Sequence, residues 1–529
     1  MIVATIFPYH WMMLGIFLTV SVICSWRMVS YYSDPSSRHG MATLVINMSV
    51  LCALSSILLI PVDIFTTTRD VQILEIASMY IAVYTGLAIA VCILTPFAYF
   101  YVDETDSGEE ECTIKSATAC RSTFYVLVGL AIVLAGIMVV GEREGSHVTT
   151  QEAANMWMQA LADDDQRKGA LYRALLIVMA TFIAFGFINV VFYGGFGLAS
   201  MPIKLIRGNL GADEEKLELE FSRLKLKQEK QAIEKRVSRS KRVREKVNEI
   251  ERKIKIAERR MAQLDRRSTK GMAYIATIIA PFRVAIGMSL MIISLLVVTT
   301  ILMGCIDRFF HSKCGFQCGY MAGKSELMPN PFDYVMVRFS EYFPLDYILF
   351  VFIALYLFLC VAHGVGRVGI RVLGVQIYKL RQRRTPAQGL LMSGAIVGIS
   401  AMAIPVILLA LSPQYVRFGS QSYVPKDGSG KLPCEMSSLI GEESTCRLTY
   451  FARFIGTQTT NNRFFSLAFF FGEAAFGLVS LVSLLHALCR RRDGAFEEEL
   501  SDDDECESDL DEGGLETIGE ELRSLTDRV

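Results

Sequence analysis

The chain has 529 residues, is 52% hydrophobic, and carries 53 basic and 54 acidic residues, so its formal net charge is −1. The hydrophobic share alone does not separate membrane proteins from soluble ones. The distribution does, because long windows with almost no charge alternate with short charged segments. Transmembrane β-strands are only about 10 residues long, so apolar runs of this length exclude a β-barrel.

Apolar windows long enough for helices that cross a bilayer need about 20 residues. The windows found here are apolar on all sides rather than along one stripe, as lipid-facing helices are. In chain order they cover roughly residues 8–27, 41–62, 76–101, 122–141, 172–200, 283–304, 345–365, 388–411 and 464–489. The sequence therefore predicts an all-α fold, a polytopic transmembrane helical bundle with about nine spans.

The first window resembles a signal peptide only in its hydrophobicity. No Lys or Arg precedes Arg27, and no cleavage site of small residues follows. We therefore expect a retained first helix whose short N-terminal end lies in a lumen or outside the cell. Nine spans then place the C-terminus in the cytosol.

Positive charge supports this orientation, because short cytosolic loops carry an excess of Lys and Arg. Basic residues are concentrated in residues 202–271 and 366–386, which this topology makes cytosolic. The run YKLRQRRT, Tyr378 to Thr385, is the clearest cytosolic mark.

The expected organisation has four parts. These are spans one to five in residues 1–201, a cytosolic basic helical hairpin in 202–272, spans six to nine with disulfide-bearing lumenal loops in 273–489, and a disordered acidic cytosolic tail in 490–529.

The hairpin prediction depends on two apolar stripes within residues 212–268. The second stripe has the alternating 4-3 spacing of a coiled-coil seam, in Val243, Val247, Ile250, Ile254, Ala257, Met261 and Leu264. The first begins at Leu217, and a break near Ser238 separates the two registers. The basic charge fits an anionic cytosolic leaflet or a partner helix better than nucleic acid. Whether the seam joins two copies in a homodimer is left open.

The C-terminal tail is acidic and nearly free of aromatic residues, which predicts disorder. Ser501 and Ser508 precede acidic clusters, the context that acidophilic kinases favour, so both are candidate phosphorylation sites. A regulated trafficking tail and a merely solvating chain end both fit this composition.

Four of the 13 cysteines fall in loops that the topology makes lumenal: Cys314, Cys318, Cys434 and Cys446. An even number of cysteines in an oxidising compartment indicates disulfides. Pairing within each loop is the simplest of the three connectivities, and a Cys434–Cys446 bridge would stabilise its loop by about 3 kcal/mol. A metal at Cys314 and Cys318 has no further nearby ligand beyond His311.

Two segments resemble nucleotide-binding motifs, but neither has the full pattern or context of such a site. GVGRVG, Gly364 to Gly369, matches the dinucleotide pattern, but it follows a span rather than a strand, and no acidic residue lies about 20 positions on. Close helix packing or a helix break explains it better. GYMAGKS, Gly319 to Ser325, is one residue short of a phosphate-binding loop. We expect neither an enzyme nor a bound cofactor or metal.

Polar residues inside spans are more informative, because each is costly in hydrocarbon and usually has a partner or a role. Glu473, about ten residues into the ninth window, is the strongest candidate for a functional role. His363, Asn47 and Asn189 are weaker candidates. A transport site or proton relay is the functional interpretation. The alternative is an interhelical hydrogen bond that stabilises packing.

A Pro-x-Asp pattern appears at the edge of two windows, as Pro61 with Asp63 and Pro344 with Asp346. Pro344 and Asp346 suit the first turn of a helix. Asp63 follows the end of a span, where the helix dipole disfavours a carboxylate. It therefore needs another source of stabilisation, such as lumenal water, a cation or the start of a new helix. The two sites could line a substrate entrance, or they could simply mark the ends of two spans.

Several segments together resemble one membrane-protein family. They are LLIPVDIF (58–65), MPIKLIRG (201–208), YFPLDYIL (342–349), YKLRQRRTPAQGLL (378–391) and LSPQYVRFGSQSYV (411–424). They look like the LMBR1-like membrane family, collinear from about residue 40 to 490, and most like its lysosomal cobalamin branch. The SPQYVRFGSQ segment followed by paired cysteines is the most specific.

The resemblance implies nine spans, a lumenal N-terminus, a cytosolic C-terminus and a lysosomal membrane location, with the plasma membrane or another endomembrane as alternatives. It also implies a role in moving cobalamin from the lysosome to the cytosol, with a peroxisomal-type ABC ATPase as partner. Cobalamin would be the transported ligand rather than a cofactor.

Three functions are compatible with these features of the sequence. In a transport component, the candidate pathway or gate residues are Asp63, Asp346 and Glu473, together with Tyr415, Arg417 and Gln421 of the SPQYVRFGSQSYV segment. In a membrane receptor or scaffold, residues 212–268 and the acidic tail would recruit partners instead. A proton- or lipid-linked transporter of another substrate is suggested by Glu473 alone.

Overall fold

The computed structural model describes residues 40–69, 76–106, 112–141, 170–207, 270–311, 330–340, 344–372, 375–378, 385–424, 432–434, 446–461 and 463–489, with scattered positions elsewhere. The chain divides into two units. The larger comprises Met1–Met201 and Ile293–Leu484 and contains the packed helical bundle; the smaller comprises Pro202–Ile292 and Leu485–Val529.

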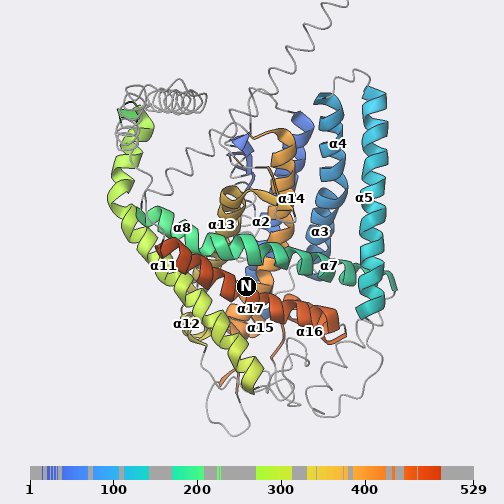
Figure 1. Cartoon of the computed structure of the whole chain (residues 1–529). Coiled ribbons are helices and arrows are strands. Elements are labelled where there is room, and N and C mark those ends of the chain that lie inside the picture. The colour runs from blue at the N-terminus through green and yellow to red at the C-terminus, as the bar shows by residue number, and fades with distance from the viewer. Residues whose placement is uncertain are drawn as a thin grey trace, which may run out of the picture. The chain divides into compact units, whose positions relative to one another are not determined.

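Eight helical segments within the described residues are long and apolar enough to cross a membrane. They are Gly40–Arg69, Ile76–Thr105, Thr113–Gly136, Leu175–Ile206, Phe282–Phe310, Leu345–Val368, Ala387–Leu411 and Phe464–Cys489. These match the last eight predicted windows, which confirms the all-α polytopic fold (Figure 1). The window at 8–27 lies mainly outside the described residues.

The long helices are α2 (Gly40–Arg69), α5 (Cys112–Gly141), α11 (Lys270–His311), α13 (Leu345–Val368), α14 (Ala387–Leu411) and α17 (Arg463–Cys489). Two further spans are composite. One joins α3 (Ile76–Ile89), the π-helical turn η1 (Ala90–Leu94) and α4 (Thr95–Asp106); the other joins α7 (Ala170–Asn189), η2 (Val190–Gly194) and α8 (Gly195–Arg207).

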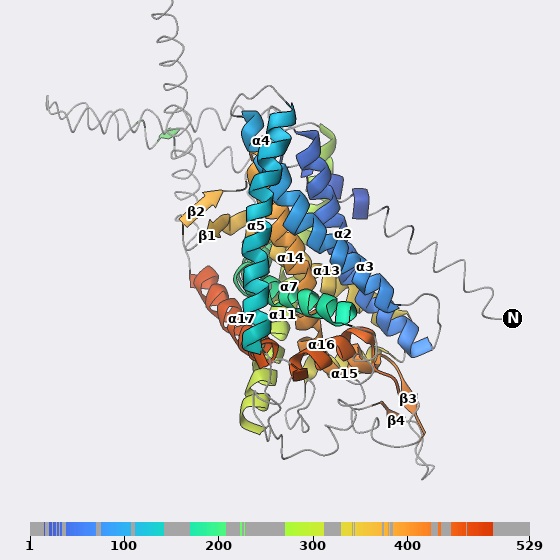
Figure 2. The same ribbon diagram turned by 90° about the vertical axis from the view of Figure 1, so that its right-hand side faces the viewer.

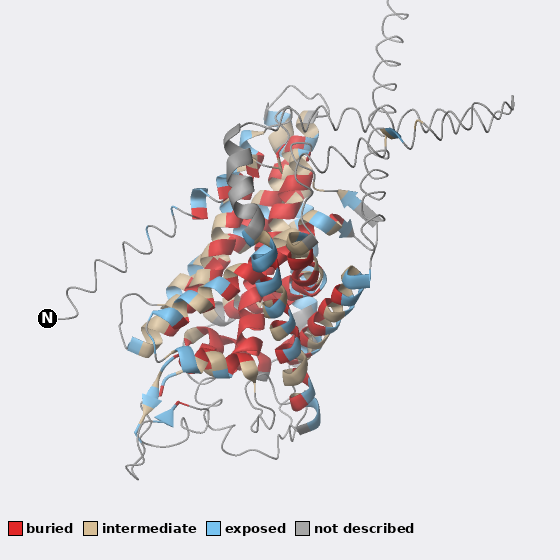
Figure 3. Ribbon diagram, turned by 90° about the vertical axis from the view of Figure 1, so that its left-hand side faces the viewer, coloured by how far each residue is buried: buried red, intermediate tan, exposed pale blue. Residues whose placement is uncertain are grey.

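The core lies around α14, whose residues Ala401–Leu411 are all buried. This helix contacts α2, α7, α13 and α4, and buried residues gather in the middle of the bundle (Figure 3). By contrast, α5 contacts α4 and η1, and most of its described side chains are exposed. Exposed apolar side chains on a span are the expected lipid-facing surface.

Short elements that the sequence did not predict lie at the two ends of the bundle (Figure 2). At one end are the helices α12 (Pro331–Phe339), α15 (Pro413–Phe418) and α16 (Tyr450–Asn461), and the two-residue strands β3 (Ser422–Tyr423) and β4 (Leu432–Pro433). At the other end, β1 (Ile370–Val372) pairs antiparallel with β2 (Val375–Tyr378). We call these the disulfide end and the β1–β2 end.

The segment GVGRVG is now explained by packing, as expected. A Cβ at Gly364 would collide with the backbone carbonyl of Tyr193, so this glycine allows α13 to approach η2 closely. Gly369 follows α13 with φ of 72°, a left-handed conformation that ends the helix at little cost for glycine. The segment is a helix end and has no strand before it.

Candidate functional site

Three buried aspartates from three different helices converge on the disulfide end. Asp63 of α2 and Asp346 of α13 are each 1% exposed, and Asp333 of α12 is 4% exposed. Each accepts hydrogen bonds from α15 or α16. We call the described residues between 412 and 461, which include α15, β3, β4 and α16, the cap.

Asp63 holds the start of α16. Its Oδ1 accepts a hydrogen bond from the backbone N–H of Tyr450 at 3.0 Å, and its Oδ2 accepts one from Phe451 at 2.9 Å. The Tyr80 hydroxyl donates to Oδ2 at 3.4 Å, and the Tyr80 ring stacks on Tyr450 with centroids 5.4 Å apart. The first N–H groups of a helix have no partner within it, so a carboxylate there is favourable. The new helix start is thus what stabilises Asp63.

Asp333 and Asp346 hold α15. The two oxygens of Asp333 accept the backbone N–H groups of Gln414 at 3.0 Å and Tyr415 at 3.2 Å. The Tyr415 hydroxyl in turn donates to Oδ2 of Asp346 at 2.9 Å. Burial, and next the Asp346 carboxylate, raise the pKa of Tyr415, so this hydroxyl remains a donor. Asn330 completes the contact, since its amide donates to the carbonyl of Leu411 at 3.0 Å.

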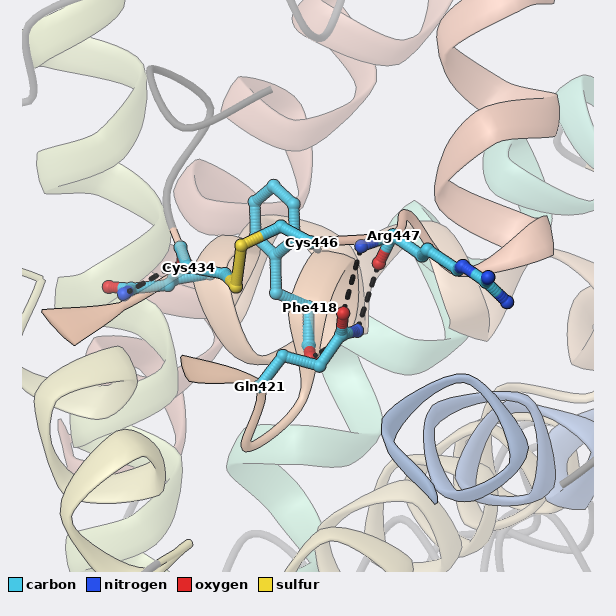
Figure 4. Close-up of a disulfide and its surroundings, with 6 residues drawn as sticks. Phe418, Gln421, Cys434, Cys446 and Arg447 are labelled. Carbon is cyan, nitrogen blue, oxygen red and sulfur yellow. Dashed lines mark hydrogen bonds between the residues drawn. A yellow bond between two sulfur atoms is a disulfide. The ribbon is translucent and has the colours of Figure 1, made fainter. Parts of the chain in front are cut away.

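The disulfide joins the two strands of the cap to its last helix. Cys434 pairs with Cys446, which confirms this prediction, and Phe418 packs against the bridge (Figure 4). The side chain of Gln421 forms two bonds to the backbone of Arg447: the N–H of Arg447 donates to Oε1 at 2.8 Å, and Nε2 donates to its carbonyl at 2.9 Å (Figure 4). Gln421 therefore fixes the segment that leads from the disulfide to α16.

The turn after α15 brings the cap against α2. Gly419 has φ of 61°, and a Cβ at this position would collide with Oγ1 of Thr68. The backbone carbonyl of Arg417 accepts the N–H of Thr449, and the Thr449 hydroxyl donates to Val416 at 2.8 Å. The start of α16 is thus tied to α15 by the Thr449 hydroxyl and by backbone groups, with Arg417 contributing through its carbonyl.

Glu473 lies apart from this assembly. It is 2% exposed on α17, and its Oε2 accepts from the Arg308 guanidinium of α11 at 3.1 Å. A buried carboxylate in a span is costly unless it is paired, so this ion pair joins two spans. That geometry is the one required by the packing alternative.

A family model described as LMBR1-like membrane protein matches residues 10–282, more than half of the chain. The chain belongs to the LMBR1-like membrane protein family. Of the candidate pathway residues, Asp63 alone lies within the matched range; the others follow it in the chain.

Individual LMBR1-like relatives match over nearly the full length. A probable lysosomal cobalamin transporter of Nematostella vectensis is 25% identical, with 94% of this chain and 97% of that protein covered. One from Dictyostelium discoideum is 26% identical, with 93% and 97% covered. The lysosomal cobalamin transport escort protein LMBD1 of Xenopus tropicalis is 24% identical, with 95% and 97% covered. No solved structure matches.

The structure of this LMBR1-like chain brings most of the candidate residues together. Asp63, Asp346, Tyr415, Arg417 and Gln421 all belong to the cap or to its attachments, and Glu473 does not. In this structure, the Asp63 and Asp346 side chains are buried and hydrogen-bonded within the protein. Their role as a pathway or gate stays a prediction.

Other candidates lie outside the described residues. These are Cys314, Cys318, Ser501, Ser508 and most of residues 212–268. Among the residues that the structure does describe, no group of three or more His, Cys, Asp or Glu side chains is arranged to hold a metal ion.

Sequence reasoning missed Asp333, Arg308 and Tyr80. A signal was present for Asp333, because Asn330 and Pro331 precede it as a helix cap and first turn, and the Asn330 side chain does cap α12. Arg308 lies within the last turn of α11, where a cation suits the helix dipole. Tyr80 gave no signal, since a tyrosine near a span end is common.

Proposed function

We propose that this LMBR1-like chain is a lysosomal membrane protein that takes part in the export of cobalamin from the lumen to the cytosol. The observation that carries the proposal is the collinear match, over 93–95% of this chain, to proteins named for lysosomal cobalamin transport or escort. Cobalamin is the transported ligand.

The disulfide end faces the lumen in this proposal. The Cys434–Cys446 bridge suits an oxidising compartment. At the β1–β2 end, Tyr378 of β2 is followed in the sequence by a basic run, and positive charge favours the cytosol. In chain order, α2 ends at the disulfide end and α3 begins there, since Asp63 and Tyr80 contact each other and α16, and α14 ends there before α15. The N-terminus is then lumenal and the C-terminus cytosolic.

We further infer that the chain assists transport rather than driving it, with an ABC ATPase as partner. Both carboxylate oxygens of Asp63 and of Asp333 accept hydrogen bonds from the cap, Oδ2 of Asp346 accepts one from Tyr415, and the Glu473 carboxylate is paired with Arg308. Such groups stabilise an assembly instead of presenting charge to a substrate. The sequence also lacks a complete phosphate-binding loop, so a partner has to supply ATP hydrolysis.

The receptor or scaffold alternative differs in what the cytosolic segment does. If residues 212–268 recruit the ATPase or cytosolic proteins, their deletion abolishes partner capture and export together. A self-sufficient transporter keeps cobalamin export after the same deletion.

The decisive experiment measures retention of labelled cobalamin in lysosomes of cells that lack this protein. Restoring the full chain should release the retained label, and restoring the chain without residues 212–268 separates the two roles, provided that both proteins reach the lysosome at equal levels. Normal release in the deficient cells would contradict the proposal.

A further inference from the structure

The short helix α12 has two unlike faces. Its inner face carries Phe332, Asp333 and Met336, which are 3%, 4% and 0% exposed. Its outer face presents Tyr334, which is 73% exposed, and Phe339 at the last position of the helix is 36% exposed. An aromatic surface of this kind on a membrane protein calls for a partner or for lipid.

The neighbouring helix α13, which contacts α12, carries an exposed stripe of its own. Leu345, Ile348, Phe352 and Leu359 are each 44–61% exposed and follow one another at 3-, 4- and 7-residue steps, so they lie on one side of that helix. Because α13 is a span, this side is where acyl chains pack.

The corner between the two helices places a third aromatic residue at the end of the stripe. Tyr342 is 60% exposed. Its N–H donates to the carbonyl of Phe339 at 2.9 Å, and the N–H of Leu345 donates to the Tyr342 carbonyl at 2.8 Å. Two successive tight turns therefore lead from α12 directly to the first lipid-facing residue of α13.

The kind of side chain changes across this corner. The α13 stripe is composed of Leu, Ile and Phe, whereas Tyr334 and Tyr342 add a hydroxyl to an aromatic ring. Tyr and Trp are enriched where hydrocarbon meets water, because the ring enters the apolar layer and the polar tip remains hydrated. The change from aliphatic to tyrosyl side chains marks such a boundary.

We propose that α12 is an interfacial helix, with Tyr334 and Tyr342 inserted at the headgroup level of the same bilayer that α13 spans. The partner is the lipid surface itself. Continuity with the lipid-facing stripe of α13 favours it over a second protein. The proposal is independent of cobalamin and of which compartment this end faces.

This placement gives α12 a mechanical role. Its inner face holds α15, because Asp333 accepts the N–H groups of Gln414 and Tyr415, and Asn330 donates to the carbonyl of Leu411. One face of the helix thus contacts lipid while the other contacts the cap. The position of α12 at the membrane surface then determines how far α15 lies from the bilayer.

The test uses depth-dependent fluorescence quenching on the full-length chain. The three native tryptophans, Trp11, Trp26 and Trp157, are replaced by phenylalanine. A single tryptophan is then introduced by Tyr334→Trp, or by Tyr342→Trp as a second reporter. The protein is reconstituted in phosphatidylcholine vesicles that contain lipid brominated either near the headgroup or deep in the acyl chains.

Two matched variants bracket the expected depth. Phe352→Trp lies seven residues into α13, which is about 10 Å along the helix, and deep bromine should quench it best. Val424→Trp, next to β3 and 63% exposed, should be quenched by neither lipid. The Tyr334→Trp and Tyr342→Trp emissions should fall most with shallow bromine. Thermal unfolding of each variant confirms that it is folded.

Other results overturn the proposal. If Tyr334→Trp and Tyr342→Trp behave like Val424→Trp, α12 does not contact lipid, and protection of these residues from aqueous acrylamide would then assign the face to a second copy of the chain. If deep bromine quenches them as well as it quenches Phe352→Trp, α12 lies within the hydrocarbon and not at its surface.

Discussion

The carboxylate of Asp63 accepts the backbone N–H of Phe451 at 2.9 Å, across 388 positions of the chain. Asp63 lies inside α2, nearly two turns before that helix ends at Arg69, and Phe451 lies in the first turn of α16, the helix that precedes the last span. The expectation that Asp63 follows the end of a span was wrong, because α2 continues through Pro61 and Asp63 to Arg69. The buried aspartate is tolerated inside the helix because the N-terminus of another helix supplies its hydrogen-bond donors.

Replacing Asp63 should loosen α16. In Asp63→Ala, the N–H groups of Tyr450 and Phe451 lose their acceptors, and each unpaired buried group costs about 1–3 kcal/mol. Asp63→Asn keeps one acceptor oxygen, so its loss should be smaller. Thermal unfolding in detergent measures the order, and backbone hydrogen exchange at residues 450 and 451 shows whether the loss is local.

The matched control for Asp63 is Asp103→Asn. Asp103 is exposed and lies at the β1–β2 end, where Gln388 donates to it at 3.3 Å, so stability should change by about 0.5 kcal/mol or less. Equal stability of Asp63→Ala and the wild-type chain would show that the cap is held by other contacts.

The Arg308–Glu473 pair separates packing from transport. Arg308→Ala leaves the buried Glu473 carboxylate without its partner in this pair and should cost about 3 kcal/mol. The double variant Arg308→Met with Glu473→Leu removes both charges and should recover most of that loss. Thermal unfolding compares the two proteins.

Cobalamin retention in cells then assigns the role of this pair. If the double variant is stable and releases cobalamin normally, Glu473 serves packing. If it is stable but retains cobalamin, the charge itself is needed for transport, and the packing interpretation fails.

Close approach of α13 to η2 predicts that Gly364→Ala is destabilising. The added methyl would collide with the Tyr193 carbonyl, and overpacking of this kind costs about 1–3 kcal/mol. Gly129→Ala on α5 is the control, since nothing lies within 4 Å of its added Cβ and alanine favours a helix by up to about 1 kcal/mol. A similar melting temperature for both variants would refute the tight crossing.

Loss of the disulfide should affect the cap selectively. Cys434→Ser with Cys446→Ser removes a bridge that closes a 12-residue separation, at a cost of about 3 kcal/mol. Faster backbone exchange is expected in α15 and around Gln421, whose carbonyl accepts the N–H of Cys434. Cys489→Ser, at an exposed free cysteine, is the control. Unchanged exchange in α15 would mean that the aspartates suffice.

The sequence alone determined where the chain can cross a membrane. A span is a local property, because every backbone group in hydrocarbon must be satisfied within the helix and its side chains must be apolar. Windows at 345–365 and 388–411 therefore correspond to α13 and α14 within a few residues, and the window at 41–62 corresponds to α2, which continues to Arg69. The sequence also predicted the pairing of Cys434 with Cys446, since both lie in one loop.

The tertiary structure decided what the polar residues do. Asp63 needed a donor, and its sequence neighbours did not reveal that the donor was the start of α16, nearly four hundred residues away. The short helices α12, α15 and α16 lack long apolar windows, so the sequence did not predict them and only the tertiary structure showed them. Three-dimensional packing decides which distant residues become hydrogen-bond partners. Their spacing along the sequence does not predict these pairs.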